Sequence, residues 1–125
     1  MIALDSSALL AFLYREKGAE QVAEVAAECC ISAVNLAEVL GRFAREGHDP
    51  TPILAGIESS ALEIVPFGTQ QAALTAALVP ATAAQRLSLG DRACLALAAS
   101  RGIPALTADR AWAKLDLGIS VRLIR

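Results

Sequence analysis

The sequence predicts a single α/β domain in which a parallel, doubly wound sheet is covered by helices on both faces. Short apolar runs alternate with helical patterns five times along the 125 residues, and this alternation is typical of parallel sheets. Hydrophobic residues make up 55% of the chain, which is enough to bury one core of ordinary size. No repeat or linker divides the chain, so we expect one domain over residues 1–125.

The first strand and its helices are predicted from residues 2–28. The apolar run 2–4 ends at the residues 5–7, Asp-Ser-Ser, which are favoured at helix starts, so a strand and then a helix over 8–13 are expected. After a break at Lys17 and Gly18, apolar side chains recur at helical spacing over 19–28. Three glutamates lie along the opposite face, which indicates an amphipathic surface helix.

A second strand and helix follow directly. Residues 29–31 are apolar and too few for a helix, and Ser32 can cap a helix over 33–45. The composition of 46–52, with Gly, Asp and two prolines, predicts a loop, and a short helix is expected over 53–59.

The C-terminal half continues the alternation. A strand is expected at 62–67, a helix at 69–79, a small-residue loop at 80–85 and an alanine-rich helix at 90–100 that Gly102 ends. The remaining elements are a strand at 103–107, a brief helix at 109–115 and a closing strand at 120–124.

Charge and cysteine content exclude several classes of protein. The net charge of −2 argues against a basic nucleic-acid coat and an acidic tail. Cys29, Cys30 and Cys94 lack the spacing of metal ligands or a disulfide framework, so they are expected to be small buried hydrophobes, the first two on opposite faces of a strand. Prolines and polar residues interrupt the longest uncharged stretch, 64–85, which argues against a membrane span. With no basic leader, a cytoplasmic location is expected.

Three aspartates could carry chemistry, and each has a structural alternative. Asp5 and Asp109 follow strands at the carboxyl edge of the sheet, where sites form in this class of fold, yet each could simply cap a helix. Asp91 could likewise form a capping box with Ser88.

Glu38 needs another explanation because it lies in the middle of a helix. A surface ion pair with Arg42, four residues later, is the alternative to a functional role. As a set, these four carboxylates would repel one another at one sheet edge unless a cation lay among them. Ligands that are all oxygen favour Mg²⁺ or Mn²⁺, which can activate water and stabilise a phosphoryl oxygen.

Other polar residues could support these acids. The hydroxyls of Ser6, Ser7 and Thr107 lie beside Asp5 and Asp109 in the sequence and could orient a carboxylate or cap a helix. Three arginines near the acids are possible phosphate contacts, namely Arg15, Arg92 and Arg110. The single histidine, His48, has no nucleophile beside it in its loop.

Four segments carry a resemblance to a known family. They are Leu-Asp-Ser-Ser-Ala-Leu at 4–9, Ser-Ala-Val-Asn-Leu-Ala-Glu-Val at 32–39, Leu-Ser-Leu-Gly-Asp-Arg-Ala-Cys-Leu-Ala-Leu-Ala at 87–98 and Leu-Thr-Ala-Asp-Arg-Ala-Trp at 106–112. In this order they resemble the PIN-domain toxins of the VapC type, the toxins of prokaryotic type II toxin–antitoxin systems.

The resemblance implies a fold, a chemistry and partners. The fold is a PIN-like sheet in the order 3-2-1-4-5, with the site between the first and fourth strands. The chemistry is that of a Mg²⁺- or Mn²⁺-dependent endoribonuclease, a hydrolase that leaves 5′-phosphate and 3′-hydroxyl ends on RNA. The acidic quartet maps to Asp5, Glu38, Asp91 and Asp109, with Asn35 and Thr107 in support. A homodimer and a VapB-type antitoxin are the implied protein partners.

Two other functions remain open from the sequence. One is a non-catalytic binding module whose acids cap helices. The other is an aspartate-based phosphatase, although Ser7 stands where that chemistry places a second Asp and the only lysines are Lys17 and Lys114. The sequence contains neither of the glycine-rich motifs that bind dinucleotides (GxGxxG) or nucleoside triphosphates (GxxxxGK followed by Ser or Thr).

Overall fold

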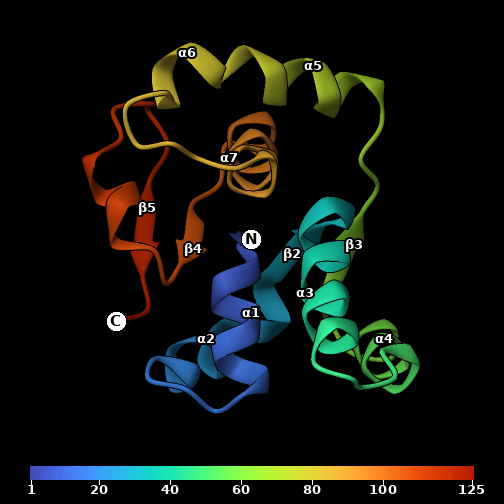
Figure 1. Ribbon diagram of the computed structural model, residues 1–125. Coiled ribbons are helices and arrows are strands. Elements are labelled where there is room, and N and C mark those ends of the chain that lie inside the picture. Colours follow the sequence, from blue (N-terminus) through green and yellow to red (C-terminus); the bar gives the residue numbers. More distant parts are fainter.

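In the computed structural model, which describes residues 1–125, five parallel strands form one sheet in the order β3-β2-β1-β4-β5 (Figure 1). The strands are β1 (Ile2–Leu4), β2 (Cys29–Ser32), β3 (Glu63–Val65), β4 (Ala105–Thr107) and β5 (Val121–Leu123). The predicted class and strand order are both confirmed. β1 is central and pairs with β2 on one side and β4 on the other, so the strand order reverses beside β1, where crevices form in such sheets.

Helices cover both faces of the sheet. Figure 1 shows α1 to α4 gathered below it and α5 to α7 above it. The lower group is α1 (Ser6–Leu13), α2 (Ala19–Val25) with the 3₁₀ turn η1 (Ala26–Glu28), α3 (Ala33–Arg45) and α4 (Thr51–Glu58). The upper group is α5 (Thr69–Ala77), α6 (Val79–Thr82) and α7 (Leu89–Arg101), and the 3₁₀ helix η2 (Arg110–Lys114) precedes β5.

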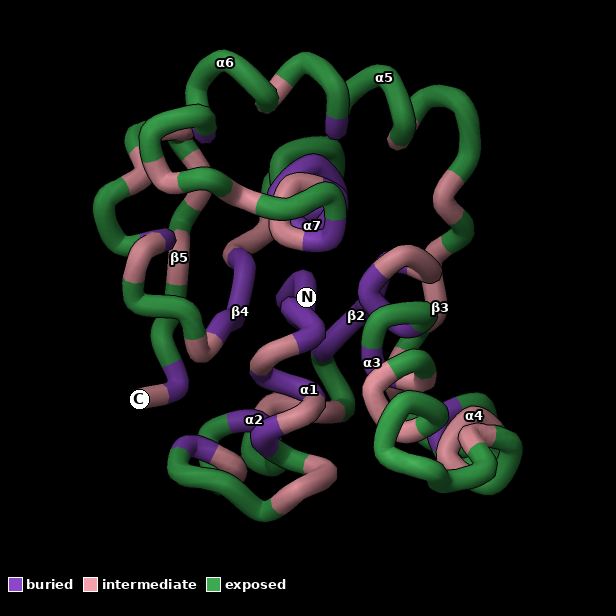
Figure 2. Tube along the Cα trace, in the orientation of Figure 1, coloured by how far each residue is buried: buried purple, intermediate pink, exposed green.

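Alternating side chains of the strands divide the core in two. Ile2 and Leu4 pack with α1 to α4, whereas Ala3 between them packs with α7 and Trp112. Cys29 and Cys30 divide in the same way, and all three cysteines are buried and free, as expected. Figure 2 shows this burial concentrated in β1, β2, β4 and α7. Alanines on α7 let that helix lie close to the sheet.

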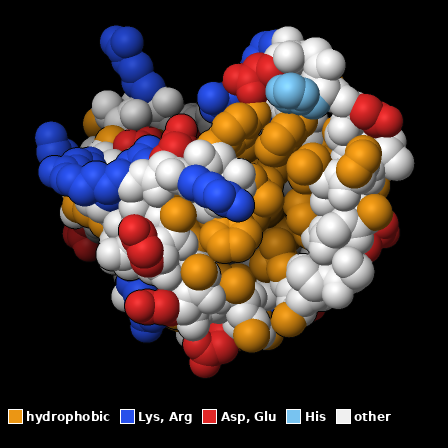
Figure 3. Space-filling view, turned by 90° about the horizontal axis from the view of Figure 1, so that it is seen from below, with side chains coloured by type: hydrophobic (Ala, Val, Ile, Leu, Met, Phe, Trp, Pro, Cys, Tyr) orange, Lys and Arg blue, Asp and Glu red, His pale blue; other side chains and the backbone are white.

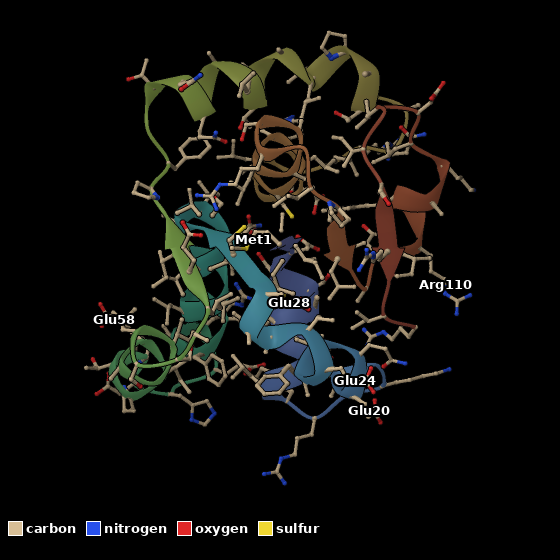
Figure 4. All side chains as sticks on the ribbon, turned by 180° about the vertical axis from the view of Figure 1, so that it is seen from behind. Met1, Glu20, Glu24, Glu28, Glu58 and Arg110 are labelled. Atoms are coloured by element: carbon tan, nitrogen blue, oxygen red, sulfur yellow. The ribbon has the colours of Figure 1, made fainter.

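The outer face of α2 and η1 is polar, as the periodicity predicted. Glu20, Glu24 and Glu28 are all exposed, and Figure 4 shows the first two on the outer side of α2. Val22, on the inner side, is 1% exposed. None of the helices combines the length and apolarity needed to cross a membrane.

Some element boundaries differ from the prediction. Helix α1 starts at Ser6 and not at residue 8, and Asp5 is the residue that precedes it. The prediction of a loop over 80–85 is wrong for its first half, because α6 forms a helical turn there with Pro80 near its start. Proline lacks only an N–H that a first helical turn does not use, so it fits there. Gly102 adopts a left-handed conformation with φ of 62° and ends α7 as expected.

Candidate active site

Asp5 lies at the carboxyl end of the central strand and is 3% exposed. Although it immediately precedes α1, its side chain makes no capping hydrogen bond. Instead, Ser7 Oγ donates to its Oδ2 at 2.6 Å and Thr107 Oγ1 donates to the same oxygen at 2.8 Å. The capping alternative therefore does not account for the side chain of Asp5.

Burial raises the pKa of Asp5 to about 6. The two hydroxyl donors act in the opposite sense because they stabilise the carboxylate, and the charge of Asp91 adds to the upward shift of the pKa. A carboxylate that is costly to ionise in a protein interior is typical of sites that hold cations or move protons.

Ser7 and Thr107 join the ends of β1 and β4. Ser7 Oγ accepts the backbone N–H of Ala108 at 3.0 Å, and Thr107 Oγ1 accepts the backbone N–H of Asp109 at 3.0 Å. Because each hydroxyl also donates its proton to Asp5, both act as relays between the main chain at the end of β4 and the carboxylate at the end of β1. The start of the segment that bears Asp109 is thereby fixed relative to Asp5.

Glu38 is held by side chains from two helices. Ser6 Oγ donates to Glu38 Oε1 at 2.6 Å, and Asn35 Nδ2 donates to the same oxygen at 3.3 Å. Asn35 is fully buried and also donates to Ser6 Oγ and to the carbonyl oxygen of Gly90, each at 3.0 Å. The ion pair with Arg42 that the spacing suggested does not form, because Arg42 Nε reaches Glu46 instead, at 2.9 Å.

Asp91 and Asp109 both make capping hydrogen bonds. Asp91 Oδ2 accepts the backbone N–H of Ser88 at 2.9 Å, and Ser88 Oγ accepts that of Asp91, which forms the capping box that the sequence suggested. Asp109 Oδ1 accepts the backbone N–H of Ala111 at 2.9 Å at the start of η2. Helix capping therefore accounts for one carboxylate oxygen of Asp91 and one of Asp109.

A buried thiol lies near three of the acids, and their charges affect its pKa. Burial is the first cause that raises the pKa of Cys94, and the charges of Asp5, Asp91 and Glu38 raise it further, together with Cys30. Cys94 lies on α7 beneath the end of β1, where its Sγ is 3.9 Å from the carbonyl oxygen of Ala3. The carboxylates of Asp5, Glu38 and Asp91 thus all raise the pKa of this thiol, although they do not form one metal-binding cluster.

The donor set of these carboxylates fits a hard cation, although their spacing is open. In each of the four, one oxygen is held by a hydrogen bond and the other makes no hydrogen bond to a side chain. Free carboxylate oxygens are the ligands that Mg²⁺ and Mn²⁺ prefer. No three acidic, imidazole or thiol groups lie close enough to ligate one metal ion. Binding of an ion would therefore require the side chains to move toward one another.

The three arginines lie in different surroundings. Arg15 is at the far end of α1 from Asp5, in a surface hollow that also contains Glu20, so the structure does not bring it to the acids. Arg110 is exposed and points away from the domain (Figure 4). Arg92 follows Asp91 on α7 and has a buried Nε without a partner.

A groove on the α1, α2 and α4 side was not predicted from the sequence. Its volume is about 500 Å³, and 13 of its 16 lining residues are hydrophobic. Figure 3 shows hydrophobic side chains gathered in a hollow on this face. Phe12 of α1 and Ile53 of α4 both line it, and Phe12 is 39% exposed. No periodicity within one helix could have indicated this groove, because residues of several separate elements form it.

Fold and site together define a parallel α/β domain with a buried carboxylate, Asp5, at the end of the central strand, where the strand order reverses. The chain belongs to the PIN domain family, whose model matches residues 2–117. A search of curated proteins finds no match to this chain.

Solved structures share this fold. A chain of a toxin–antitoxin complex from Klebsiella pneumoniae is 20% identical with a TM-score of 0.73, and the match covers 99% of this chain and 97% of that one. A chain of DNA-bound VapBC from Salmonella typhimurium is 23% identical with a TM-score of 0.74, covering 99% and 98%. A chain of VapBC-5 from Mycobacterium tuberculosis is 31% identical with a TM-score of 0.55, covering 78% and 81%. The resemblance to PIN domains of the VapC type is thereby confirmed.

Proposed function

We propose that this chain is the toxin of a type II toxin–antitoxin pair and acts as a Mg²⁺- or Mn²⁺-dependent endoribonuclease. The observation that supports this most strongly is Asp5, a buried carboxylate at the end of the central strand whose oxygens are not used for capping. The family and the toxin–antitoxin complexes among its structural neighbours support the same function.

Asp5 and Asp91 would be the main metal ligands, with Glu38 and Asp109 completing the set. When bound, Mg²⁺ or Mn²⁺ would lower the pKa of a water molecule and stabilise charge on a phosphoryl oxygen. Ser7 and Thr107 hold Asp5 Oδ2, which leaves Oδ1 as the oxygen available to a ligand. Ser6 and Asn35 hold Glu38 Oε1 in the same way.

The reaction is attack of water on an RNA phosphodiester. The phosphorus–oxygen bond to the 3′ oxygen breaks, so one fragment carries a 5′-phosphate and the other a 3′-hydroxyl. The 2′-hydroxyl takes no part, and the choice of RNA as substrate follows from the resemblance to VapC-type toxins. Since the chain has a net charge of −2, contacts to RNA must come from local arginines such as Arg92.

The proposal includes protein partners. We assign a VapB-type antitoxin as the partner and the apolar groove between α1, α2 and α4 as the place where an apolar segment of it binds. A contiguous apolar hollow of this kind on a single domain is typical of an interaction site. A homodimer and a cytoplasmic location, where buried free cysteines stay reduced, belong to the same proposal.

The proposal can be tested by expressing the chain in bacteria in the absence of a partner. We expect growth to stop and a limited set of RNA species to be cut, with 5′-phosphate ends that a ligation assay detects. The Asp5→Asn variant at the same level should permit growth and leave RNA intact. Equal growth arrest by that variant would exclude Asp5 from the toxic activity.

One observation favours a second candidate, a non-catalytic binding module. Asp91 and Asp109 both serve as caps, which a module without chemistry would also need. That candidate predicts intact RNA in every condition and equal behaviour of the chain and its Asp5→Asn variant.

A further inference from the structure

Gly90 lies against the carboxylate of Glu38. It is the second residue of α7 and is buried. A Cβ atom built on Gly90 would lie well inside 3.0 Å of Oε1, Cδ and Oε2 of Glu38, a separation that real Cβ atoms essentially never show. The whole carboxyl group of Glu38 therefore occupies the space that any side chain at position 90 would need.

Glu38 is fixed in that space by hydrogen bonds from other elements. Ser6 and Asn35 both donate to its Oε1, and the same Asn35 amide donates to the carbonyl oxygen of Gly90 at 3.0 Å. Asn35 thus holds the carboxylate on α3 and the backbone on α7 at once.

Backbone geometry does not explain a glycine at position 90. Gly90 lies within a helix and its φ is outside the left-handed region, so any residue could adopt its conformation. Alanine is a better helix former than glycine and is the commonest residue in the rest of α7. The close approach of Glu38 is the feature that requires the absence of a side chain.

We propose that Gly90 is a positioning residue, which lets Glu38 lie against the first turn of α7 beside Asp91. Its importance for catalysis rests on the proposed nuclease function, whereas its contact with Glu38 can be tested without any activity. Glu38 is a flexible side chain, so the fold can accept a methyl group at position 90 if the carboxylate moves. The fold would then persist while the arrangement of the acids changes.

The contact can be tested by a double-mutant cycle on thermal stability in EDTA. In the Glu38→Ala background, Gly90→Ala should raise Tm because alanine favours the helix. In the wild-type background it should raise Tm by at least about 2 °C less, because the displaced carboxylate loses the hydrogen bonds from Ser6 and Asn35. Equal changes of Tm in the two backgrounds would overturn the inference.

The role in positioning can be tested by RNA cleavage and by Mn²⁺ affinity. Gly90→Ala should lower both by about 10-fold or more in a chain that remains folded, a loss typical of residues that support a metal ligand. Adding Glu38→Asp to Gly90→Ala should restore part of each, because the shorter side chain leaves room for the methyl group. Gly41→Ala is the matched control, since Gly41 lies on α3 and a Cβ there would contact nothing within 4 Å.

The outcomes separate this inference from the proposed function. Suppose that Gly90→Ala changes Tm differently in the two backgrounds but leaves cleavage unchanged. That result would show a mere packing contact and overturn the positioning role. An inactive wild-type chain would overturn the proposed function and with it any role of Gly90 in the reaction, while the coupling of Tm would still decide whether Gly90 makes room for Glu38.

Discussion

At residue 5 the chain places a buried carboxylate where a simple helix cap would have sufficed. The hydroxyls of Ser7 and Thr107 offset part of the cost of burying the charge, yet the pKa still rises to about 6. The neighbouring acid Asp109 is exposed and makes an ordinary capping bond. Two aspartates with the same sequence context, each after a strand, therefore differ in burial and in bonding.

The raised pKa predicts how stability depends on pH when no metal is bound. An ordinary aspartate ionises near pH 4, so between about pH 4 and 6 the folded chain binds more protons at Asp5 than the unfolded chain does. The free energy of unfolding is therefore higher when Asp5 is protonated, by about 3 kcal/mol. This contribution is fully present below pH 4 and is lost as the pH rises through 6.

Asp5→Asn should remove this loss of stability at high pH, because asparagine carries no charge. In EDTA at pH 7.5 the variant should unfold at a higher denaturant concentration than the wild-type chain, by up to about 3 kcal/mol of unfolding free energy, and the two should coincide near pH 4. Urea unfolding at several pH values measures this. A variant that is less stable than the wild-type chain at pH 7.5 would contradict the assigned burial cost.

Thr107 offers a second test at the residue scale. Thr107→Val removes one donor to Asp5, so the pKa of Asp5 should rise above 6, and cleavage at pH 7 should fall about 10-fold. Titration of the Asp5 carboxyl carbon by NMR follows the pKa directly. Thr107→Ser keeps the hydroxyl and should keep both properties, so equal loss in the two variants would point to packing instead.

At the scale of elements, the proposed function gives the first turn of α7 two tasks. Its capping box stabilises the helix through Ser88 and Asp91, and the second oxygen of Asp91 stays free for a ligand. A carboxylate at the third position of a helix can do both, because capping uses only one of its oxygens.

Substitutions at Ser88 and Asp91 should separate these tasks. Ser88→Ala should lower the free energy of unfolding by about 1 kcal/mol and leave cleavage nearly unchanged. Asp91→Asn keeps an oxygen acceptor for the Ser88 N–H, so stability should stay within about 0.5 kcal/mol while cleavage falls about 100-fold or more. If both variants lose only stability, Asp91 is a cap and nothing else.

The elements themselves were largely predictable from local patterns. Helix and strand order, the capping box of α7 and the ends of α3 and α7 depend on residues close in sequence, so hydrophobic period and cap residues indicate them. The bonding of Glu38 was not predictable in this way. Ser6 and Gly90 approach it from 32 and 52 positions away, and only the packing of α1, α3 and α7 brings them together.

At the scale of the whole molecule, the acids and the apolar groove lie in different places on the fold. None of the four acids lines the groove, which lies between α1, α2 and α4 (Figure 3). A partner bound in the groove could therefore be recognised by apolar packing, independently of the charged site.

Recognition by the groove can be tested with Phe12→Asp. Because Phe12 is 39% exposed, the variant should fold, yet it should bind the proposed VapB-type partner about 100-fold more weakly. Val79→Asp is the control, since Val79 is 44% exposed on α6, away from the groove. Calorimetry with the purified partner gives both affinities. Equal weakening, or none, would place the partner elsewhere.

The most direct test of the nuclease function is cleavage of total cellular RNA by the purified chain, with Mn²⁺ or Mg²⁺ against EDTA, beside the Asp5→Asn variant. We expect discrete fragments with 5′-phosphate ends from the wild-type chain in the presence of metal, and none in EDTA or from the variant. Cleavage that persists in EDTA, or that the variant performs equally well, would contradict a metal-dependent reaction at Asp5.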